Sequence, residues 1–573
     1  MKIVVAKTAG FCMGVRRAVE MVLDTSNENS EPIISTYGPL IHNPQVLSLL
    51  DEKGIPVIKE IPEKGSGTIL IRAHGVPPET KERLEKVGYV VKDATCPRVI
   101  KVQSIIRKHT QKKFSTIIIG DSDHPEVIGL LGYARENGYI ASTMDEFKAL
   151  PKFENAIVVA QTTQSTEFFQ EITEFVKKNN PDYKIFNTIC DSTEKRQNEI
   201  RNIAKSVDAI FVVGGKESGN TQRLAEAASL HCDNVYKIED VDGLDSIETD
   251  SFKKVAVTAG ASTPNWIIRR VCREIEKPSY KGGRLFLINL QRSLLWTNVY
   301  LAIAAGCLSL TSATLQGFSH NIYSFIIISS TYVFSMHLLN HLTAIKADQY
   351  NDPERAAFFV KYKKLLTLIA LITGGTGIMV AAEIGKLPFY VIIGMSLTGL
   401  SYNFKLFPKF LSRKYRKIKD VPGSKTVLIS LAWGVVISLL PAISEPVSVD
   451  LGTLVTFLLI SLMVFNRTAF FDILDMQGDR IVRKETIPIL IGEEKTISLI
   501  NRILIALFIV LIVSSITGVI SKLGYVLLLY PVSMFSIINI YKRGFVFPGY
   551  RLEILIESNL ILAGFISLAW MLF

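Results

Sequence analysis

Three of the six cysteines lie in short segments that could hold a metal centre: Cys12 in GFCMGV, Cys96 in DATCPRV and Cys190 in NTICDST. Their separations of 84 and 94 residues indicate three similar α/β modules, each of which donates one thiolate. Three thiolates suit a [4Fe–4S] cluster with one iron left open, and zinc is the competing metal. An open position is typical of a catalytic site, whereas four thiolates would suit electron transfer alone.

The other three cysteines carry no such signal. Cys232, Cys272 and Cys307 are interpreted as small buried apolar residues. The sequence contains no CxxC pair, and a disulfide framework is not expected in a large cytosolic domain.

Three histidines and one glutamate form a second group of reactive residues. His42 lies in LIHNP, His74 in RAHGV, and His124 and Glu126 in DHPEV. A lone histidine is usually an ordinary core or surface residue. Three histidines that each stand beside glycine or proline in a predicted loop indicate a convergent anion site instead. Such histidines can donate hydrogen bonds to a diphosphate and supply protons.

Small polar residues suggest further contacts to phosphate. Ser218, Gly219 and Asn220 in GGKESGN form a turn whose backbone N–H groups could wrap phosphate oxygens. Ser262 in TAGAS could add another donor. GGKESGN lacks the P-loop spacing, so ATP binding is not predicted.

Strands must bring these motifs together. Short apolar runs rich in β-branched residues alternate with polar, helix-forming stretches, which predicts an α/β domain with parallel sheets. Ligands of open α/β sheets bind beyond the carboxyl ends of the strands, and several motifs directly follow a run. The runs are residues 3–5, 68–71, 116–119, 156–159 and 209–213.

Together these motifs resemble the LytB/IspH family of 4-hydroxy-3-methylbut-2-enyl diphosphate reductases over residues 1–278. The motifs, in chain order, are GFCMGVRRAV, IHNP, AHGV, DATCP, HPEV, QTT, VVGGKESGN and TAGAS. The resemblance implies that Cys12, Cys96 and Cys190 hold a [4Fe–4S] cluster. It also implies a set of residues that bind the diphosphate or the hydroxyl of the substrate: His42, His74, His124, Thr162, Ser218, Gly219, Asn220 and Ser262.

The same resemblance implies the reaction. Glu126 would deliver the proton that lets the hydroxyl leave as water. Two electrons from a ferredoxin or flavodoxin would then give isopentenyl and dimethylallyl diphosphate, the last step of the methylerythritol phosphate pathway. Gly219 stands where the family commonly has serine, so only its backbone could contact the substrate.

The second half of the chain is mostly apolar and predicts a polytopic membrane bundle. We expect a linker over residues 279–293 and a membrane domain over residues 294–573. Nine apolar segments are predicted there, at residues 294–315, 322–339, 365–382, 389–402, 427–443, 451–465, 503–520, 526–540 and 554–572.

Charged loops predict the orientation of this bundle. Residues 403–425 contain eight Lys or Arg, whereas residues 316–321 and 444–450 contain none. The positive-inside rule places the basic loops in the cytoplasm. The first residues do not resemble a signal peptide, so the first half is also expected in the cytoplasm, and nine spans leave Phe573 outside. This loop pattern explains the net charge of +11 better than nucleic-acid binding.

A carboxylate cluster follows the sixth apolar segment. Asp472, Asp475 and Asp479 in FFDILDMQGDR have spacings of three and four, which place them on one helical face. A solvated acidic face is one interpretation. A Mg²⁺ ion bridging to a diphosphate is the other, because three like charges on one face repel unless a cation binds.

With RKETIPILIG and nine spans, this cluster resembles the UbiA family of intramembrane prenyltransferases over residues 290–573. The resemblance implies Mg²⁺, a prenyl diphosphate and an acceptor. In the first acidic motif of the family, Asn340 and Asp348 match, whereas His341 and Ala344 stand where aspartate is usual. Lys405 and Lys425 could contact the diphosphate.

The sequence therefore predicts a bifunctional membrane enzyme: an iron–sulfur reductase joined to a domain that transfers a prenyl group. Two alternatives remain. The second half could be a non-catalytic membrane anchor or lipid-binding module, which the altered first acidic motif favours. The first half could be a redox sensor, against which the histidines and Glu126 argue because a sensor needs no substrate site.

Overall fold

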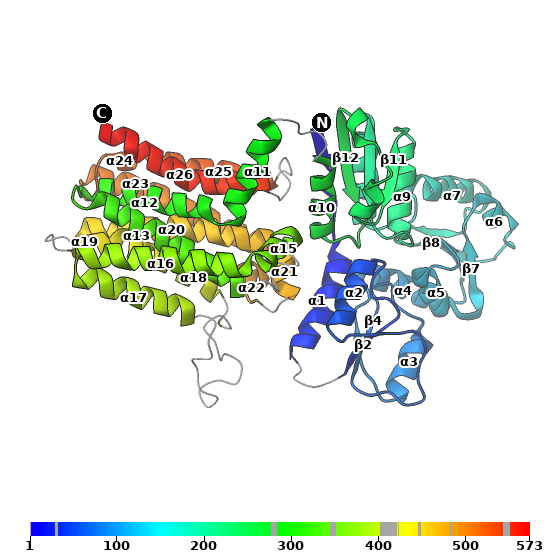
Figure 1. The fold of residues 1–573 in the computed structure, drawn as a ribbon. Helices are drawn as coiled ribbons and strands as arrows, with labels where there is room; N and C mark the ends of the chain where they lie inside the picture. Colours follow the sequence, from blue (N-terminus) through cyan, green and yellow to red (C-terminus); the bar gives the residue numbers. More distant parts are fainter. Residues whose placement is uncertain are drawn as a thin grey trace. The chain divides into compact units, whose positions relative to one another are not determined.

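The chain folds into two compact units, Met1–Tyr280 (unit 1) and Lys281–Phe573 (unit 2), which are coloured along the sequence in Figure 1. The computed structural model describes residues 2–28, 33–276, 283–343, 351–401, 421, 423–444, 449–481, 484–542 and 550–572. Three residues of the expected membrane site lie outside the described residues: Ala344, Asp348 and Lys405.

Unit 1 contains three four-stranded parallel sheets, as the alternating pattern predicts. Their strand orders are β3-β2-β4-β5, β7-β6-β8-β9 and β11-β10-β12-β1, and Figure 1 shows them as three lobes. The strands are β1 (Lys2–Val5), β2 (Ile34–Tyr37), β3 (Val57–Ile58), β4 (Thr68–Ile71), β5 (Val90–Asp93), β6 (Ser115–Ile119), β7 (Gly138–Ala141), β8 (Ala156–Ala160), β9 (Lys184–Phe186), β10 (Ala209–Val213), β11 (Val235–Ile238) and β12 (Lys254–Ala259).

The first strand of the chain completes the third sheet. β1 lies parallel to β12, with Lys2 opposite Lys254 and Val5 opposite Val257. It takes the edge position that β5 and β9 take in the other two sheets. The three modules therefore share one strand order, which confirms the three similar modules predicted from the cysteine spacing.

The inner strands form the core of each module. β4, β8 and β10 are buried along their whole length, because helices cover both faces of a parallel sheet. The helices of unit 1 are α1 (Met13–Glu28), α2 (Pro44–Glu52), α3 (Pro78–Lys86), α4 (Pro97–Thr110), α5 (Pro125–Ala134), α6 (Met144–Ala149), α7 (Thr166–Asn179), α8 (Asp191–Ala204), α9 (Gly219–Ser229) and α10 (Asn265–Glu276).

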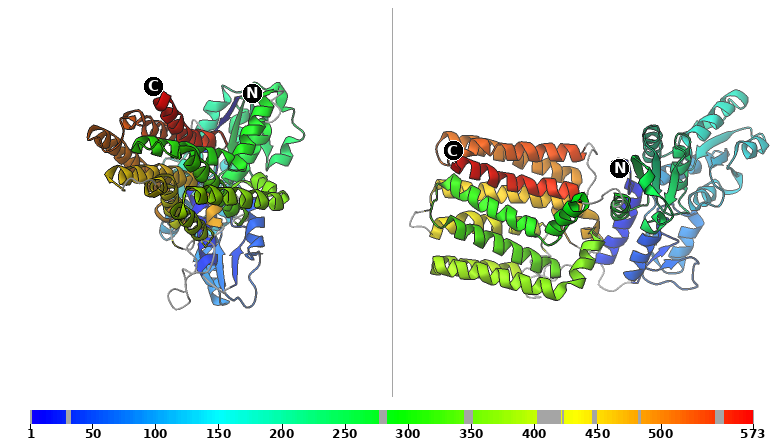
Figure 2. Two further views of the ribbon diagram at one scale, coloured as in Figure 1. Left: turned by 60° about the vertical axis from the view of Figure 1, so that its left-hand side comes forward. Right: turned by 45° about the horizontal axis from the view of Figure 1, so that its top comes forward.

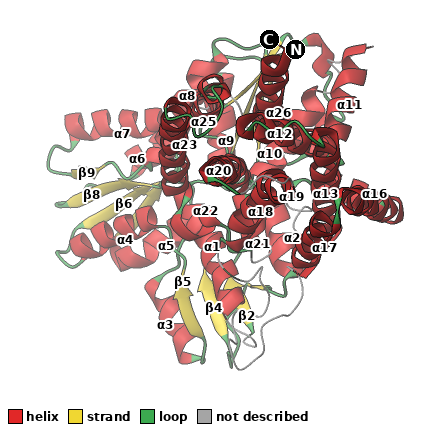
Figure 3. Ribbon diagram, turned by 90° about the vertical axis from the view of Figure 1, so that its left-hand side faces the viewer, coloured by secondary structure: helices red, strands yellow, loops and turns green. Residues whose placement is uncertain are grey.

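Unit 2 is helical in its described residues, and its long helices lie side by side (Figure 2). Viewed along the bundle, α20 is surrounded by α12, α18, α23 and α26 (Figure 3). The helices are α11 (Gly283–Trp296), α12 (Val299–Gln316), α13 (Ile322–Thr343), α15 (Pro353–Lys361), α16 (Lys363–Ile384), α17 (Lys386–Ser401), α18 (Ser424–Gly434), α19 (Leu440–Ser444), α20 (Leu451–Leu474), α21 (Met476–Ile481), α22 (Ile487–Ile491), α23 (Glu493–Ile516), α24 (Leu523–Val526), α25 (Leu529–Lys542) and α26 (Tyr550–Leu572).

Eight helices among the described residues are long and apolar enough to cross a membrane, which confirms a multi-pass domain. The predicted segment without a counterpart among these eight, residues 389–402, corresponds to α17, which has 16 residues. At 1.5 Å per residue it is about 24 Å long, shorter than the ~30 Å hydrocarbon core of a bilayer. The difference between nine predicted segments and eight candidate spans therefore lies in the length of α17.

Close packing brings α18 against α20. A Cβ atom at Gly434 would collide with the Ser461 hydroxyl and lie 2.8 Å from the ring of Phe457, so only glycine permits this approach. Residues Val435–Leu439 then form a π-helical turn before α19. Pro441 lies in α19 and has no N–H to donate, which accounts for the change in hydrogen bonding.

Candidate functional site

Each of the three cysteines lies between an edge strand and the first turn of a helix. Cys12 follows β1 and precedes α1, Cys96 follows β5 and is the N-cap of α4, and Cys190 follows β9 and is the N-cap of α8. Pro97 is the first residue of α4 and holds Cys96 in an extended conformation. The three thiols therefore stand at helix N-termini, where the helix dipole favours a thiolate.

One backbone hydrogen bond repeats in all three modules. The amide of Cys12 donates to the carbonyl of Ala261 (3.1 Å), that of Cys96 to Ala73 (2.9 Å) and that of Cys190 to Thr162 (2.9 Å). Each acceptor lies two residues beyond the end of the neighbouring inner strand, β12, β4 or β8. The bond therefore fixes each cysteine beside a strand end that carries a predicted site residue.

The thiols also interact with one another. Burial raises the pKa of the Cys96 thiol, and negative charge on Cys12 and Cys190 raises it further, while the amides of Arg98 and Val99 lower it. The Val15 amide donates to Cys12 Sγ at 3.4 Å. A side chain at Gly14 would collide with Cys96 Sγ, so the first turn of α1 packs directly on that sulfur.

The donor set of the three cysteines fits an iron–sulfur cluster. Three thiols at helix N-termini, contributed by three separate segments, are the ligands that a [4Fe–4S] cluster with one open iron requires. The three histidines form a separate group, whose ligand atoms all lie within 4.8 Å of one another.

His42, His74 and His124 converge as the sequence predicts. Their ring centroids are 4.6 Å (His42–His74), 5.5 Å (His74–His124) and 5.7 Å (His42–His124) apart. Burial lowers the pKa of all three, to about 4 for His124 and well below the usual range for His74. The triad is therefore neutral at neutral pH in the absence of a ligand.

Two ring nitrogens of the three histidines are available to bind a ligand. The Glu126 amide donates to His124 Nδ1 at 3.1 Å, so the proton of neutral His124 is assigned to Nε2. His42 Nε2 and His74 Nδ1 are buried and have no hydrogen-bond partner. Because buried polar atoms are nearly always hydrogen-bonded, these two atoms point to a missing ligand.

Glu126 is a buried carboxyl group held by one residue. It is 2% exposed, and it accepts hydrogen bonds from the Thr162 amide (2.7 Å) and the Thr162 hydroxyl (2.8 Å). Burial raises the pKa of Glu126, and the two bonds from Thr162 oppose that shift. The arrangement suits a carboxyl that must hold a proton in a dry site.

The N-terminus of α9 completes the anion site. Ser218 is the N-cap and accepts from the Thr221 amide at 3.4 Å. The Asn220 side-chain nitrogen is buried without a partner, and Ser262 donates to the His42 carbonyl at 2.9 Å. A helix N-terminus with an unpaired amide nitrogen is a favourable place for phosphate oxygens.

Gly219 stands where serine is common in the family that unit 1 resembles. A Cβ atom there would lie 3.3 Å from Arg223 Nη1 and 3.8 Å from Asp121 Oδ2. Its φ is outside the left-handed region that favours glycine. The backbone therefore does not require glycine, but a serine side chain would require a small shift of the Arg223 guanidinium.

Sequence reasoning missed the arginines around this site. Arg223 forms hydrogen bonds of 2.9 and 3.1 Å to both oxygens of Asp121. Arg196 is 4% exposed and donates to the carbonyls of Gly10 (2.6 Å) and Ala259 (2.9 Å). Both arginines lie on polar helices, where a charged residue is normally expected to face solvent. Their partners are far away in the sequence, so no local pattern predicts these contacts.

In unit 2, two of the three predicted carboxylates are paired with lysines. Asp472 is fully buried; Lys425 Nζ lies 2.7 Å from its Oδ1 and the Thr426 hydroxyl donates to its Oδ2 at 2.5 Å. Asp479 is 1% exposed, with Lys484 Nζ at 2.9 Å from Oδ1 and no partner on Oδ2. Asp475 caps α20.

The described part of the first motif lies beside Arg355. Asn340 and His341 lie near the end of α13. His341 Nε2 is 2.9 Å from Arg355 Nη2, which also donates to Asn298 Oδ1 at 3.0 Å. In the segment that follows this motif, Asn351 donates to Asp479 Oδ1 at 3.4 Å, so among the described residues this segment contacts the second acidic motif.

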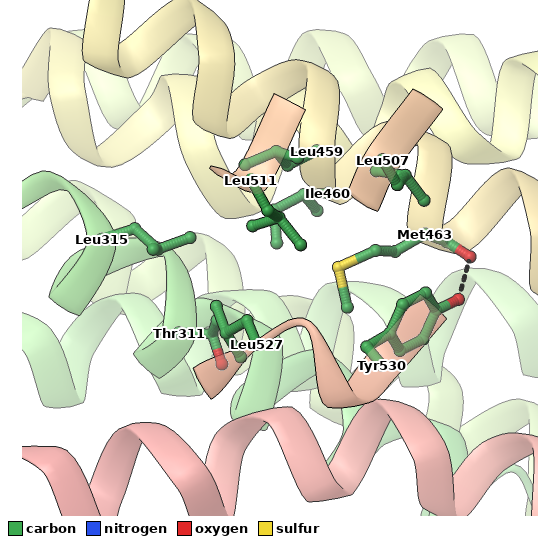
Figure 4. Close-up of a pocket in the computed structure, with 9 residues that line it drawn as sticks. All are labelled: Thr311, Leu315, Leu459, Ile460, Met463, Leu507, Leu511, Leu527 and Tyr530. Carbon is green, nitrogen blue, oxygen red and sulfur yellow. Dashed lines mark hydrogen bonds between the residues drawn. The ribbon is translucent and has the colours of Figure 1, made fainter. Parts of the chain in front are cut away.

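A small cavity lies elsewhere in the bundle (Figure 4). Its volume of about 10 Å³ is room for one water at most. Its tyrosine hydroxyl, on Tyr530, already donates to the Met463 carbonyl at 2.9 Å. The cavity is therefore an apolar packing defect and not a substrate site. It is lined by Thr311, Leu315, Leu459, Ile460, Met463, Leu507, Leu511, Leu527 and Tyr530.

Known proteins resemble each unit separately. Residues 3–276 match the family model of LytB protein, and residues 299–545 match that of the UbiA prenyltransferase family. The 4-hydroxy-3-methylbut-2-enyl diphosphate reductase of Caldanaerobacter subterraneus subsp. tengcongensis is 40% identical over 285 residues, which cover 49% of this chain and 98% of that protein. The reductase of the same name from Thermoanaerobacter pseudethanolicus is 42% identical over 278 residues, or 48% of this chain and 96% of the relative.

Solved structures divide in the same way. A structure of (E)-4-hydroxy-3-methyl-but-2-enyl diphosphate reductase is 38% identical and covers 48% of this chain and 99% of its own, with a TM-score of 0.39. A UbiA homolog from Archaeoglobus fulgidus bound to GPP and Mg²⁺ is 13% identical and covers 49% of this chain and 98% of its own, with a TM-score of 0.36. The chain therefore belongs to the LytB family through residues 3–276 and carries, at residues 299–545, a domain of the UbiA prenyltransferase family.

Proposed function

We propose that unit 1 reduces 4-hydroxy-3-methylbut-2-enyl diphosphate to isopentenyl and dimethylallyl diphosphate. The observation that carries this proposal is the link through Thr162. Its amide and hydroxyl hold Glu126, and its carbonyl accepts the hydrogen bond of the Cys190 amide. A proton-bearing carboxyl is thereby fixed beside a cysteine of the metal centre.

The residues divide the reaction between them. His42, His74, His124 and the N-terminus of α9 bind the diphosphate, and Glu126 gives its proton to the hydroxyl that leaves as water. The overall change consumes two electrons and two protons and breaks one C–O bond. A [4Fe–4S] cluster held by Cys12, Cys96 and Cys190 would supply the electrons, which come from a ferredoxin or flavodoxin. A redox sensor has no use for the anion site, which argues against that alternative.

We further propose that unit 2 binds a prenyl diphosphate and transfers its prenyl group to an acceptor. Asp479 Oδ2 is buried without a partner, and an unpaired carboxylate oxygen is an acceptor that a Mg²⁺ ion beside the diphosphate would satisfy. We expect Lys425 and Lys484, which pair with Asp472 and Asp479, to contact the diphosphate as well. The alternative, a non-catalytic membrane anchor or lipid-binding module, needs none of these buried charges.

The orientation of unit 2 depends on α17. Basic loops follow α13, α17 and α20 in the sequence, and loops poor in charge alternate with them. This alternation requires α17 to cross the membrane despite its length. We propose that unit 1 and the Asp472 end of α20 are cytoplasmic and that Phe573 is outside.

Glu126→Gln should retain the metal centre and lose activity. The amide keeps the shape of the side chain and cannot give up a proton, so turnover should fall by roughly 10²–10⁴. Iron and sulfide content and steady-state turnover of the anaerobically purified chain measure the two effects. Glu146→Gln, at an exposed glutamate that accepts from the Ser142 amide, is the matched control. Near-normal turnover of Glu126→Gln would assign the proton to another group.

Thr162→Val should shift the pH dependence of turnover. The Thr162 hydroxyl stabilises the ionised form of Glu126, so its removal should raise the pKa of Glu126 further. An acid must be protonated to act; activity is present below that pKa and lost above it. The alkaline limb of the kcat profile should therefore move to higher pH. A move to lower pH would contradict this role of the hydroxyl.

Geranylgeranyl diphosphate should bind the full chain in detergent in a Mg²⁺-dependent manner. We expect EDTA to weaken binding, because it removes the cation that offsets the negative charges of the carboxylates and the diphosphate. Lys425→Met should weaken binding by about tenfold or more, because a charge-assisted hydrogen bond contributes roughly 1.5–3 kcal/mol. Calorimetry or filter binding measures both effects.

Two variants control this measurement. Lys364→Met removes an exposed lysine of α16, and Glu126→Gln alters the reductase site; both should bind like the wild type. Equal binding by Lys425→Met and the wild type would favour the anchor alternative.

Reporter fusions test the orientation. A reporter that is active only outside the cytoplasm should be inactive after Lys425 and active after Phe573. The reverse pattern at both sites would overturn the proposed orientation, either because α17 does not cross or because the bundle is inverted. Expression of each fusion must be confirmed by immunoblotting.

A further inference from the structure

Three arginines connect the three cysteine segments of unit 1. Arg17 lies on α1, the helix after Cys12, and its Nη1 donates to the carbonyl of Thr95 at 3.0 Å. Thr95 is the residue before Cys96. The helix that begins at the first cysteine therefore holds the loop of the second.

The same relation continues around the site. Arg98 on α4 forms an ion pair with Asp191, the residue after Cys190. Arg196 on α8 donates from Nη2 to the carbonyl of Gly10, two residues before Cys12. Each cysteine helix thus reaches the segment of the next cysteine, and the three contacts close a ring, which we call the arginine ring (Arg17, Arg98 and Arg196).

The ring joins parts that the sheets leave separate. Each cysteine is tied by its amide to a strand end of its own sheet, but the distances between the sulfurs depend on contacts between modules. Gly10 has φ +106°, a conformation that favours glycine, and this turn presents its carbonyl to Arg196. Glu199, one turn beyond Arg196, accepts from the amides of Lys7 and Thr8. The Cys12 loop is therefore held by α8 at two places.

Arg196 differs from the other two members because its charge is buried. It is 4% exposed, and its hydrogen bonds at the guanidinium run to two carbonyls and the Ser192 hydroxyl. Burial lowers the pKa of Arg196, while negative charge on Cys12, Glu199 and Cys190 raises it. A buried guanidinium is costly unless negative charge lies nearby, and a thiolate-bound cluster supplies such charge.

We propose that the arginine ring consists of positioning residues that hold the three thiols in the arrangement of the cluster, and that the buried charge of Arg196 raises the reduction potential of that cluster. The inference rests on the proposed reductase function. Cluster potentials depend on net charge and burial. An added electron makes the cluster more negative, so a buried cation beside it stabilises the reduced form.

The burial of the three arginines predicts how strongly each one contributes to holding the cluster. The side chains of Arg98 and Asp191 are 41% and 61% exposed, and exposed ion pairs contribute little. Arg17 is half-buried and bonds to a carbonyl. Cluster retention should therefore depend most on Arg196, less on Arg17 and least on Arg98.

The test uses the full chain, purified anaerobically in detergent, and does not rely on turnover. Iron and sulfide per chain measure retention, and a redox titration followed by electron paramagnetic resonance measures the potential. Arg196→Met should lose at least half of the cluster, and the remainder should have a lower potential than the wild type. Arg196→Lys keeps the charge with fewer donors, so it should keep the potential and lose an intermediate share of the cluster.

Arg201→Met is the matched control, because Arg201 lies on the same helix and pairs with Glu167 of α7, away from the cysteine segments. It should match the wild type in both measurements. Arg17→Met, which removes one bond and should lose a smaller share of the cluster, tests the ring even if Arg196→Met fails to fold, as judged by circular dichroism.

The outcomes separate the two proposals. A wild-type chain without iron and sulfide would overturn the reductase function and the inference with it. A wild-type cluster with unchanged content and potential in Arg196→Met would overturn the inference alone. Equal potentials in Arg196→Lys and Arg196→Met would overturn the role of the charge.

Discussion

The backbone hydrogen bond from each cysteine amide to the strand end beside it is the contact on which unit 1 depends. It occurs at Cys12, Cys96 and Cys190, once in each sheet, and it joins an edge strand to an inner strand. On its far side stand Ser262, His74 and Thr162, next to or at the acceptor residue. A single bond type therefore places each cysteine beside a residue that we propose binds substrate, in all three modules. The proposed metal ligands and the proposed anion-binding residues stand on opposite sides of the same bond.

The electrostatics of this site follow from the same geometry. Helix N-termini favour negative charge, and here they face both the thiols and the anion site. The histidines are kept neutral by burial, so they do not repel one another at the centroid distances they adopt. A bound diphosphate would favour their charged forms, and affinity for it should therefore increase as the pH falls. The imidazoles, the Asn220 amide and the backbone N–H groups carry no net charge. These groups can therefore lie close together without repulsion when no anion is bound.

Much of unit 1 could be predicted from sequence, because its chemistry is local. Thiols, imidazoles and glycine turns directly follow apolar runs, and parallel sheets collect the ends of such runs at one edge. The pairing of β1 with β12 could not be predicted, since it joins residues some 250 positions apart, and no local period records it. The same limit applies to Arg196 and to Lys425. The sequence pattern around a charged residue on a helix is the same whether its side chain faces water or a buried partner. Only the tertiary packing distinguishes an exposed charge from a buried one.

Unit 2 shows why that packing matters for buried charge. A charged side chain within a membrane span costs ~2.5–3.5 kcal/mol on insertion scales, and the described spans contain several. Within the candidate spans, Arg467 of α20 pairs with Glu557 of α26 and Lys425 of α18 with Asp472 of α20. Lys484 pairs with Asp479 of α21, outside those spans. Each of these carboxylates has a cation from the chain itself. His341 Nε2 lies 2.9 Å from Arg355 Nη2. The cation that compensates a buried carboxylate can lie far from it in the sequence: Lys425 is 47 positions from Asp472, and Arg467 is 90 positions from Glu557.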